Sequence, residues 1–191
     1  YPVPGHAAIL RGFEMSSNNG SSTIRDSRLS NNTSLSGGGL YVGSSTGQAT
    51  AVVINSLIDG NVASGSALGS NGGGARSASN GDLTLVNATL SGNSATLSGG
   101  GVFADNIVRL FNVTLTANTA DADADGAGNG GGITISSGVP LGFGTARNSL
   151  IAANVDASPT GAQHLNCSGT LTGEGFNLLG ATTGCTITGV T

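Results

Sequence analysis

Three short segments decide the fold: Thr84-Leu-Val-Asn87, Leu90-Ser-Gly-Asn93 and Gly99-Gly-Gly-Val102. Two apolar pieces each lead to an asparagine, and a glycine triplet then leads into a third apolar piece. Short apolar and β-branched runs bounded by Asn and Gly predict β-strands. The segments lack the 3.6-residue apolar period that would predict a helix.

The same pattern recurs along the chain, and a fixed internal repeat outweighs any strand-by-strand interpretation. A first anchor, Asp or Asn, follows one apolar piece, and a second anchor, always Asn, stands six residues later. Successive units lie 29, 32, 25 and 36 residues apart, so length varies only outside the anchored part. The first anchors are Asp26, Asn55, Asn87, Asn112 and Asn148; the second anchors are Asn32, Asn61, Asn93, Asn118 and Asn154; the glycine triplets are 37–39, 72–74, 99–101 and 130–132.

The repeat also predicts how the strands pair. No two-residue Asn-Gly or Asp-Gly turn joins the pieces of a unit, so hairpins within a unit are not expected. Each strand can pair instead with its copy in the next unit, which gives parallel sheets around one narrow core. We predict an all-β parallel β-helix, a β-solenoid, with three short strands per coil and about five to seven coils. Residues 1–22 are predicted to be a partial coil or lead-in, 23–156 the repeats, and 157–191 an atypical terminal coil.

Side-chain order within a unit predicts which positions are buried. The residue two before the first anchor and the residue three after it should point inward, and each buried aliphatic side chain stabilises by about 1.5–3 kcal/mol. The residue one before the first anchor should point outward. Its apolar members predict a contact surface, or a face covered by an inserted loop or the terminal segment. This possible interface comprises Ile54, Val86 and Phe111, with Leu57 and Leu150 on the second strand.

The stacked anchors predict asparagine ladders at the bends. Asn amides can hydrogen-bond from coil to coil, and Asn tolerates left-handed backbone angles. The predicted ladder residues are Asn55, Asn87, Asn112 and Asn148 in one column, and Asn32, Asn61, Asn93, Asn118 and Asn154 in the other.

With these motifs, the chain resembles the secreted right-handed parallel β-helix repeat proteins of bacteria. The pattern apolar-x-Asn-x-x-(Leu/Ile)-x-x-Asn, then Gly-Gly-Gly-(Ile/Val/Leu), is also similar to the repeats of polymorphic outer-membrane adhesins, where Phe stands in place of this Leu or Ile. The resemblance runs from about Thr23 to Cys185. It implies a right-handed coil and a secreted or cell-surface structural or adhesive role. Such families graft different sites on one scaffold, so it identifies no ligand.

Cys167 and Cys185 are the two cysteines of the chain, and both lie in the segment that departs from the repeat. We expect them to form a disulfide, which implies an oxidising compartment. The alternative is two buried free thiols, because a metal site would need more ligands than the distant His164 offers.

An Asp-x-Asp-x-Asp-Gly run, at Asp121, Asp123, Asp125 and Gly126, matches the opening of a calcium loop. The position that should hold the bidentate Glu is Gly132. Calcium is therefore a possible cofactor, and a solvated surface insertion is the alternative.

Composition excludes two kinds of partner. Only 8% of the 191 residues are charged, the net charge is −4, and all six basic residues are Arg. Neither a basic nucleic-acid groove nor a polybasic membrane anchor fits this composition. No apolar run approaches the roughly 20 residues of a membrane-spanning helix.

The sequence favours a non-catalytic role. Glycosidase or lyase chemistry needs carboxylates that converge on a cleft, or an acidic metal site with a base, and the outward repeat positions carry no such set. We expect an extracellular structural or adhesive module that contacts a surface glycan or host ligand, or that self-associates end to end into a filament. The alternatives are a carbohydrate-binding or carbohydrate-cleaving β-helix and, more remotely, a trimeric fibre domain.

Overall fold

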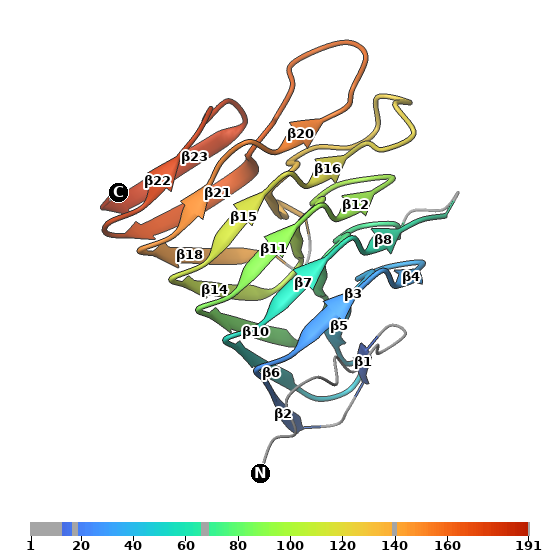
Figure 1. Cartoon of the computed structure of the whole chain (residues 1–191), viewed down its shortest axis with the longest axis vertical. Helices are drawn as coiled ribbons and strands as arrows, with labels where there is room; N and C mark the ends of the chain where they lie inside the picture. Colours follow the sequence, from blue (N-terminus) through green and yellow to red (C-terminus); the bar gives the residue numbers. More distant parts are fainter. Residues whose placement is uncertain (1–12, 17–18, 66–68, 139–140, 191) are drawn as a thin grey trace.

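The computed structural model describes residues 13–16, 19–65, 69–138 and 141–190. These residues form strands, turns and bends, and every strand pair among them is parallel. The strands stack in coils from the N-terminal to the C-terminal end of the molecule (Figure 1). The prediction of an all-β chain with stacked parallel strands is confirmed. No helix in the described part of the chain is long and apolar enough to cross a membrane.

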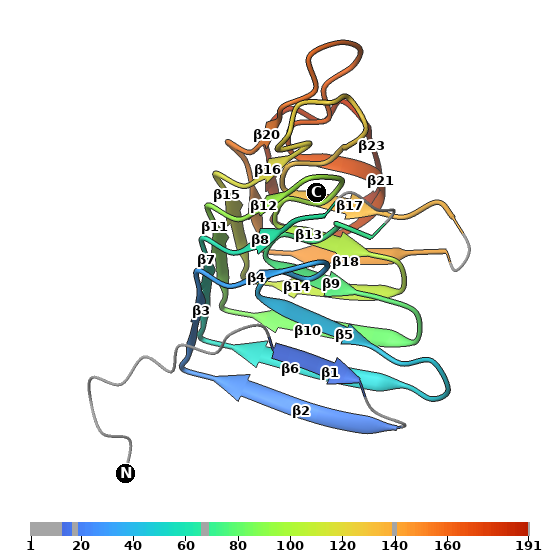
Figure 2. The same cartoon turned by 90° about the vertical axis from the view of Figure 1, so that its right-hand side faces the viewer.

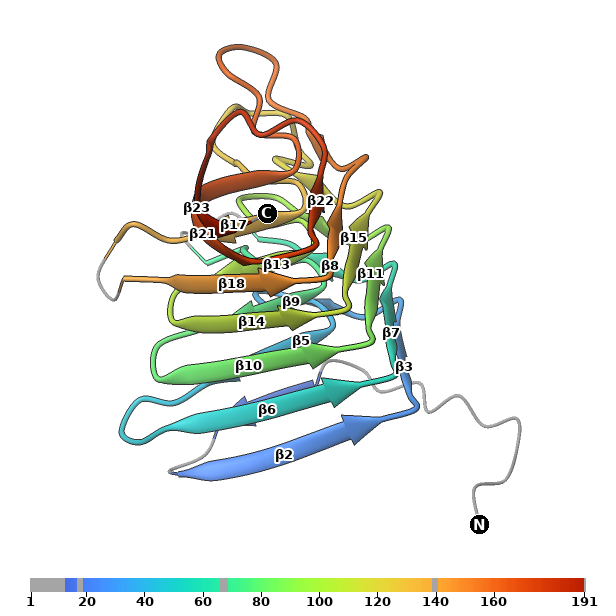
Figure 3. The same cartoon turned by 90° about the vertical axis from the view of Figure 1, so that its left-hand side faces the viewer.

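Equivalent strands of successive coils form four rows, each named here by its first strand (Figures 2 and 3). The β1 row contains β1 (Phe13–Ser16), β5 (Leu40–Gly43), β9 (Ala75–Ser77), β13 (Val102–Ala104), β17 (Ile133–Ile135) and the start of β21 (Cys167–Glu174). The β2 row contains β2 (Gly20–Arg25), β6 (Ala49–Ile54), β10 (Gly81–Val86), β14 (Ile107–Phe111), β18 (Phe143–Arg147), the later part of β21, and β23 (Cys185–Val190).

Two further rows complete each coil. The β3 row contains β3 (Arg28–Ser30), β7 (Leu57–Asp59), β11 (Thr89–Ser91), β15 (Thr114–Thr116), β19 (Leu150–Ile151) and β22 (Leu178–Leu179). The β4 row contains β4 (Thr33–Ser34), β8 (Val62–Ala63), β12 (Ser94–Ala95), β16 (Thr119–Ala120) and β20 (Val155–Asp156). Because β21 pairs with both β17 and β18, the β1 and β2 rows join into one 12-stranded sheet.

The number of strands per coil differs from the prediction of three. A complete coil such as β6, β7, β8 and β9 supplies four strands. The additional strand directly follows the second anchor and is only two residues long, as in Val62–Ala63. A two-residue strand carries no alternation of apolar and polar residues, so its sequence gives no signal of the kind that predicts longer strands.

The predicted inward positions form the core. Leu29, Ile58, Leu90, Leu115 and Ile151 are all fully buried, as are Val53, Leu85 and Leu110 in the column two residues before the first anchor. Ile24 of that column packs against the core but is only partly buried. Its strand, β2, pairs with β6 as the outermost member of its row, so it has a neighbouring strand of the row on one side only.

Candidate functional site

The first-anchor residues form an exposed ladder at the bend between the β2 and β3 rows. Each has a positive φ of 48–56°, the left-handed conformation that Asn and Asp tolerate better than other side chains. Each Asn amide nitrogen donates to the side-chain oxygen of the preceding coil. The distances are 3.2 Å (Asn55 to Asp26), 3.2 Å (Asn87 to Asn55), 2.9 Å (Asn112 to Asn87) and 2.7 Å (Asn148 to Asn112).

Phe176 takes the next position of this exposed ladder. The backbone N–H of Asn112 bonds to the carbonyl of Arg147, which precedes Asn148; in the same way, the N–H of Asn148 bonds to the carbonyl of Gly175, which precedes Phe176. Phe176 also has a positive φ, of 60°. A phenylalanine therefore stands where the repeat elsewhere places Asn or Asp, and this residue is 81% exposed.

A surface depression of about 420 Å³ lies at this end of the ladder, lined by Phe111, Asn112, Arg147, Asn148 and Phe176. Phe111 and Arg147 are cross-strand neighbours on β14 and β18. Arg147, Asn148 and Phe176 are exposed, whereas Phe111 is half-buried. The depression thus combines two aromatic rings, one guanidinium and two amides.

The arginines of the described residues divide into two groups. Arg28, Arg76 and Arg109 form ion pairs with Asp59, Asp105 and Asp82, respectively, each across neighbouring coils. The hydrogen bond and charge of Asp59 raise the pKa of Arg28 above its ordinary value. Arg25 and Arg147 have no ion pair or side-chain hydrogen bond within the part of the chain that the structure describes. Arg147 is therefore a free cation at the edge of the depression.

The second-anchor residues form a separate, buried ladder. Each amide nitrogen donates to the side-chain oxygen of the following coil at 2.9–3.0 Å from Asn32 through Asn118. That direction is opposite to the direction of the exposed ladder. The ladder continues beyond Asn154 to Asn166, whose oxygen accepts the Asn154 amide at 3.2 Å. The ladder residues are 0–4% exposed: Asn32, Asn61, Asn93, Asn118, Asn154 and Asn166.

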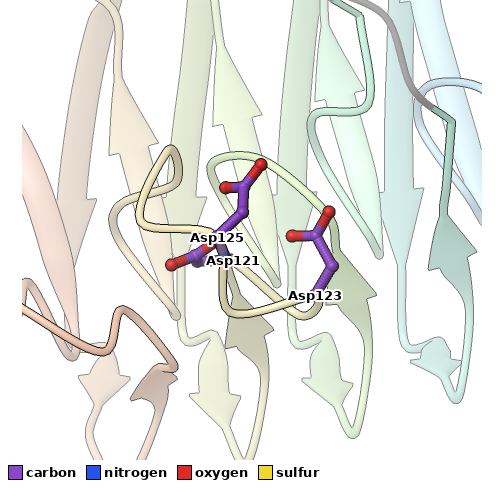
Figure 4. Close-up of side chains that lie close together, drawn as sticks. All are labelled: Asp121, Asp123 and Asp125. Carbon is purple, nitrogen blue, oxygen red and sulfur yellow. The ribbon is translucent and has the colours of Figure 1, made fainter.

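The three aspartates of the predicted calcium loop come from one loop (Figure 4), and their nearest oxygens lie within 4.8 Å of one another. Asp121 is buried, whereas Asp123 and Asp125 are exposed. The Asp121 carboxylate accepts backbone hydrogen bonds from Asp125 at 3.2 Å and Gly126 at 3.0 Å, so it already anchors the loop. Gly132 lies at the coil bend, where its carbonyl accepts from Val102 at 2.9 Å. Calcium binding stays a prediction of the sequence pattern.

The predicted apolar interface points outward but is not fully exposed. Ile54, Val86 and Phe111 pair in register on adjacent strands, and they are half-buried, as are Leu57 and Leu150. Coils about 4.8 Å apart cover part of one another's side chains. Phe176 and Leu178 are more exposed than these five residues; Leu178 pairs with Leu150 and is 66% exposed.

The expected disulfide is present between Cys167 and Cys185. Disulfides persist in oxidising environments, so the bond indicates a non-cytoplasmic compartment.

The sequence did not predict the structural roles of three residues, Phe176, Asn166 and Asp156. Phe176 carries one usable signal, because Leu179 follows it by the same three residues that separate Asn148 from Ile151. Asn166 reaches the buried ladder from an irregular loop, so no repeat spacing predicts it. Asp156 is buried and accepts bonds from Ser158 and the His164 backbone, and it thereby closes that loop.

No protein-family model matches this chain, and no curated protein or solved structure matches it either.

Proposed function

We propose that this chain is a non-catalytic, extracellular adhesive module that binds a surface glycan through the depression between Phe111, Arg147 and Phe176. The observation that carries the proposal is the composition of the depression, in which aromatic, guanidinium and amide groups converge on the outer face of a regular stack. Aromatic rings pack against the C–H face of a sugar, and amides and guanidinium groups exchange hydrogen bonds with its polar substituents. A stack of hydrogen-bonded coils holds these groups in fixed positions, which lowers the entropy cost of binding.

The absence of acid–base groups from the depression supports a non-catalytic role. Its five lining residues include no carboxylate, histidine, cysteine or hydroxyl. Three other carboxylates, Asp59, Asp82 and Asp105, are occupied by arginines of neighbouring coils. Glycoside cleavage would need two carboxyl groups facing the bound sugar.

The right-handed β-helix is the finer fold that we propose for the stacked strands. A crossover between parallel strands of one sheet is right-handed in about 98% of cases, because only that hand lets right-twisted strands pack back on the sheet. The Cys167–Cys185 disulfide supports an extracellular location.

A glycan array tests the adhesive role directly. The purified chain, detected through an appended epitope tag, should bind a subset of immobilised glycans and release no reducing ends from them. Replacing Phe111 with alanine should weaken that binding. A chain that binds no glycan on the array, or that cleaves the bound glycan, would contradict this proposal.

End-to-end association is a second candidate role, favoured by one atom of the buried ladder. The side-chain oxygen of Asn32 is buried yet accepts no hydrogen bond from the described residues, whereas its equivalent in Asn61 accepts two. β3 and β4 are the outermost strands of their rows. A coil from a second copy could supply the missing donor and pair these edges.

Sedimentation velocity across the micromolar range tests this second role. Concentration-dependent growth into elongated species is expected. A strictly monomeric chain at every concentration would refute end-to-end association and would leave the glycan-binding proposal untouched.

A further inference from the structure

We infer that the sugar recognised at the depression carries a carboxylate, with its ring on Phe176, its carboxylate on Arg147 and a hydroxyl on the Asn148 side-chain oxygen. The inference rests on the proposed glycan-binding role and adds the chemical class of the ligand. Three features of the depression support it.

The first feature is the phenylalanine at a ladder position. A left-handed backbone is unfavourable for a residue other than Gly, Asn or Asp, and Phe176 is also 81% exposed. Asn at this position would fit the φ of 60° and could donate to Asn148 as Asn148 donates to Asn112. Both the backbone conformation and the exposed ring of Phe176 are therefore unfavourable for stability. Residues that break local structural rules in this way concentrate at functional sites.

The second feature is the acceptor that Phe176 leaves open. Every amide of the exposed ladder donates toward the N-terminal coils, and the series ends there on the carboxylate of Asp26. At the other end, the side-chain oxygen of Asn148 accepts no hydrogen bond within the described residues. Aligned hydrogen bonds polarise one another, which strengthens this terminal acceptor. A sugar hydroxyl is a suitable donor.

The third feature is the charge of Arg147. Three of the five described arginines pair with an aspartate of a neighbouring coil, but Arg147 does not. A planar guanidinium matches a carboxylate through two parallel hydrogen bonds. Glu174 follows Gly173, the strand partner of Ala146, just as Arg147 follows Ala146, yet the two side chains form no ion pair. Glu174 should repel an anionic ligand.

Isothermal titration with unsulfated chondroitin oligosaccharides, which contain glucuronic acid, tests the inference on the intact, oxidised chain. Arg147→Gln should weaken binding by about 10- to 100-fold, as expected for loss of a charge-assisted pair. Phe176→Asn should weaken it about tenfold while raising the thermal midpoint, because the ladder gains a member. Glu174→Gln should tighten binding. Phe143→Ala, which removes another exposed phenylalanine from the far end of β18, is the matched control and should leave binding unchanged.

Three ligand arms separate the possible outcomes. The carboxyl-reduced oligosaccharide should bind weakly, and equal binding would overturn the carboxylate assignment without affecting the glycan-binding role. A preference for the sulfated form that persists after carboxyl reduction would also overturn it. An oligoglutamate peptide that competes as well as the sugar would overturn both proposals. Unchanged affinity in Phe176→Asn, with the expected gain in stability, would show that the ring is not part of the site.

Discussion

Two asparagine columns with the same spacing serve different purposes because one is buried. In the buried ladder, Asn93 donates to the carbonyl of Ile58 and to Asn118, each at 2.9 Å, and accepts from the backbone and side chain of Asn61. These bonds satisfy every hydrogen-bonding group of its amide. In the exposed ladder, Asn87 makes two side-chain bonds at the surface, where water can replace them.

Loss of a buried ladder amide should therefore cost far more than loss of an exposed one. Asn93→Ala is expected to lower the free energy of unfolding by about 3 kcal/mol, because it leaves buried donors on Asn61 and the carbonyl of Ile58 without partners. Asn87→Gly is the control, since glycine accepts the φ of 50°, and it should cost about 1 kcal/mol or less. Urea unfolding measures both, and equal losses would contradict the distinction.

The glycine triplets lie where the backbones of neighbouring coils approach each other closely. A Cβ on Gly100 would lie 2.4 Å from the carbonyl carbon and oxygen of Thr119 and 2.6 Å from the Gly131 oxygen. The third glycine faces the buried ladder, since a Cβ on Gly101 would lie 3.1 Å from the Asn118 amide nitrogen. Triplet and ladder therefore depend on each other.

Gly100→Ala should consequently destabilise the stack, because backbone atoms cannot move aside as a flexible side chain can. We expect a loss of roughly 3 kcal/mol, at the upper end of overpacking costs. Gly69→Ala is the matched control, because its Cβ would meet no described atom within 4 Å. Thermal unfolding of the two variants and the wild type gives the comparison, and a stability for Gly100→Ala equal to that of the control would contradict the steric argument.

The last strand depends on the disulfide more than the other strands do. Among the described residues, β23 pairs only with β21, and Cys167 and Cys185 lie 18 positions apart in the sequence. Closing a loop of that size contributes about 3 kcal/mol. Reduction should lower the thermal midpoint and increase amide exchange across Cys185–Val190 before the central coils respond. A Cys167→Ala/Cys185→Ala variant should show no response to reductant, and unchanged exchange of β23 in the reduced wild type would contradict this expectation.

The whole molecule is a one-dimensional stack, in which each coil contacts mainly its neighbours. Side chains of β10 alternate between buried and half-buried, whereas those of β2 alternate between half-buried and exposed. Local stability should therefore decrease from the central coils, where side chains are more buried, to the end coils, where they are more exposed.

Hydrogen exchange should therefore be slowest in β10 and β14 and fastest in β2 and β23. The wild-type chain under native conditions provides the internal comparison, because all four strands belong to the β2 row. Equal protection along the row would instead indicate that the stack opens as one cooperative unit.

The sequence by itself determined the parallel stack, its inward columns and both asparagine ladders. These features repeat at fixed offsets, such as the three residues from Asn87 to Leu90. When the coils stack, residues at the same offset in successive units lie above one another and form a column. Sequence also indicated the disulfide, since the chain has only Cys167 and Cys185.

Only the tertiary structure decided where the repeat is broken. It placed Phe176 at a ladder position, beside Phe111 from two coils earlier, and it distinguished the free Arg147 from the paired Arg109. Pairing and exposure depend on which coils become neighbours and on how irregular segments such as the one containing Asn166 return to the stack. No local spacing encodes these contacts, because they arise between residues that the chain brings together only when the coils close.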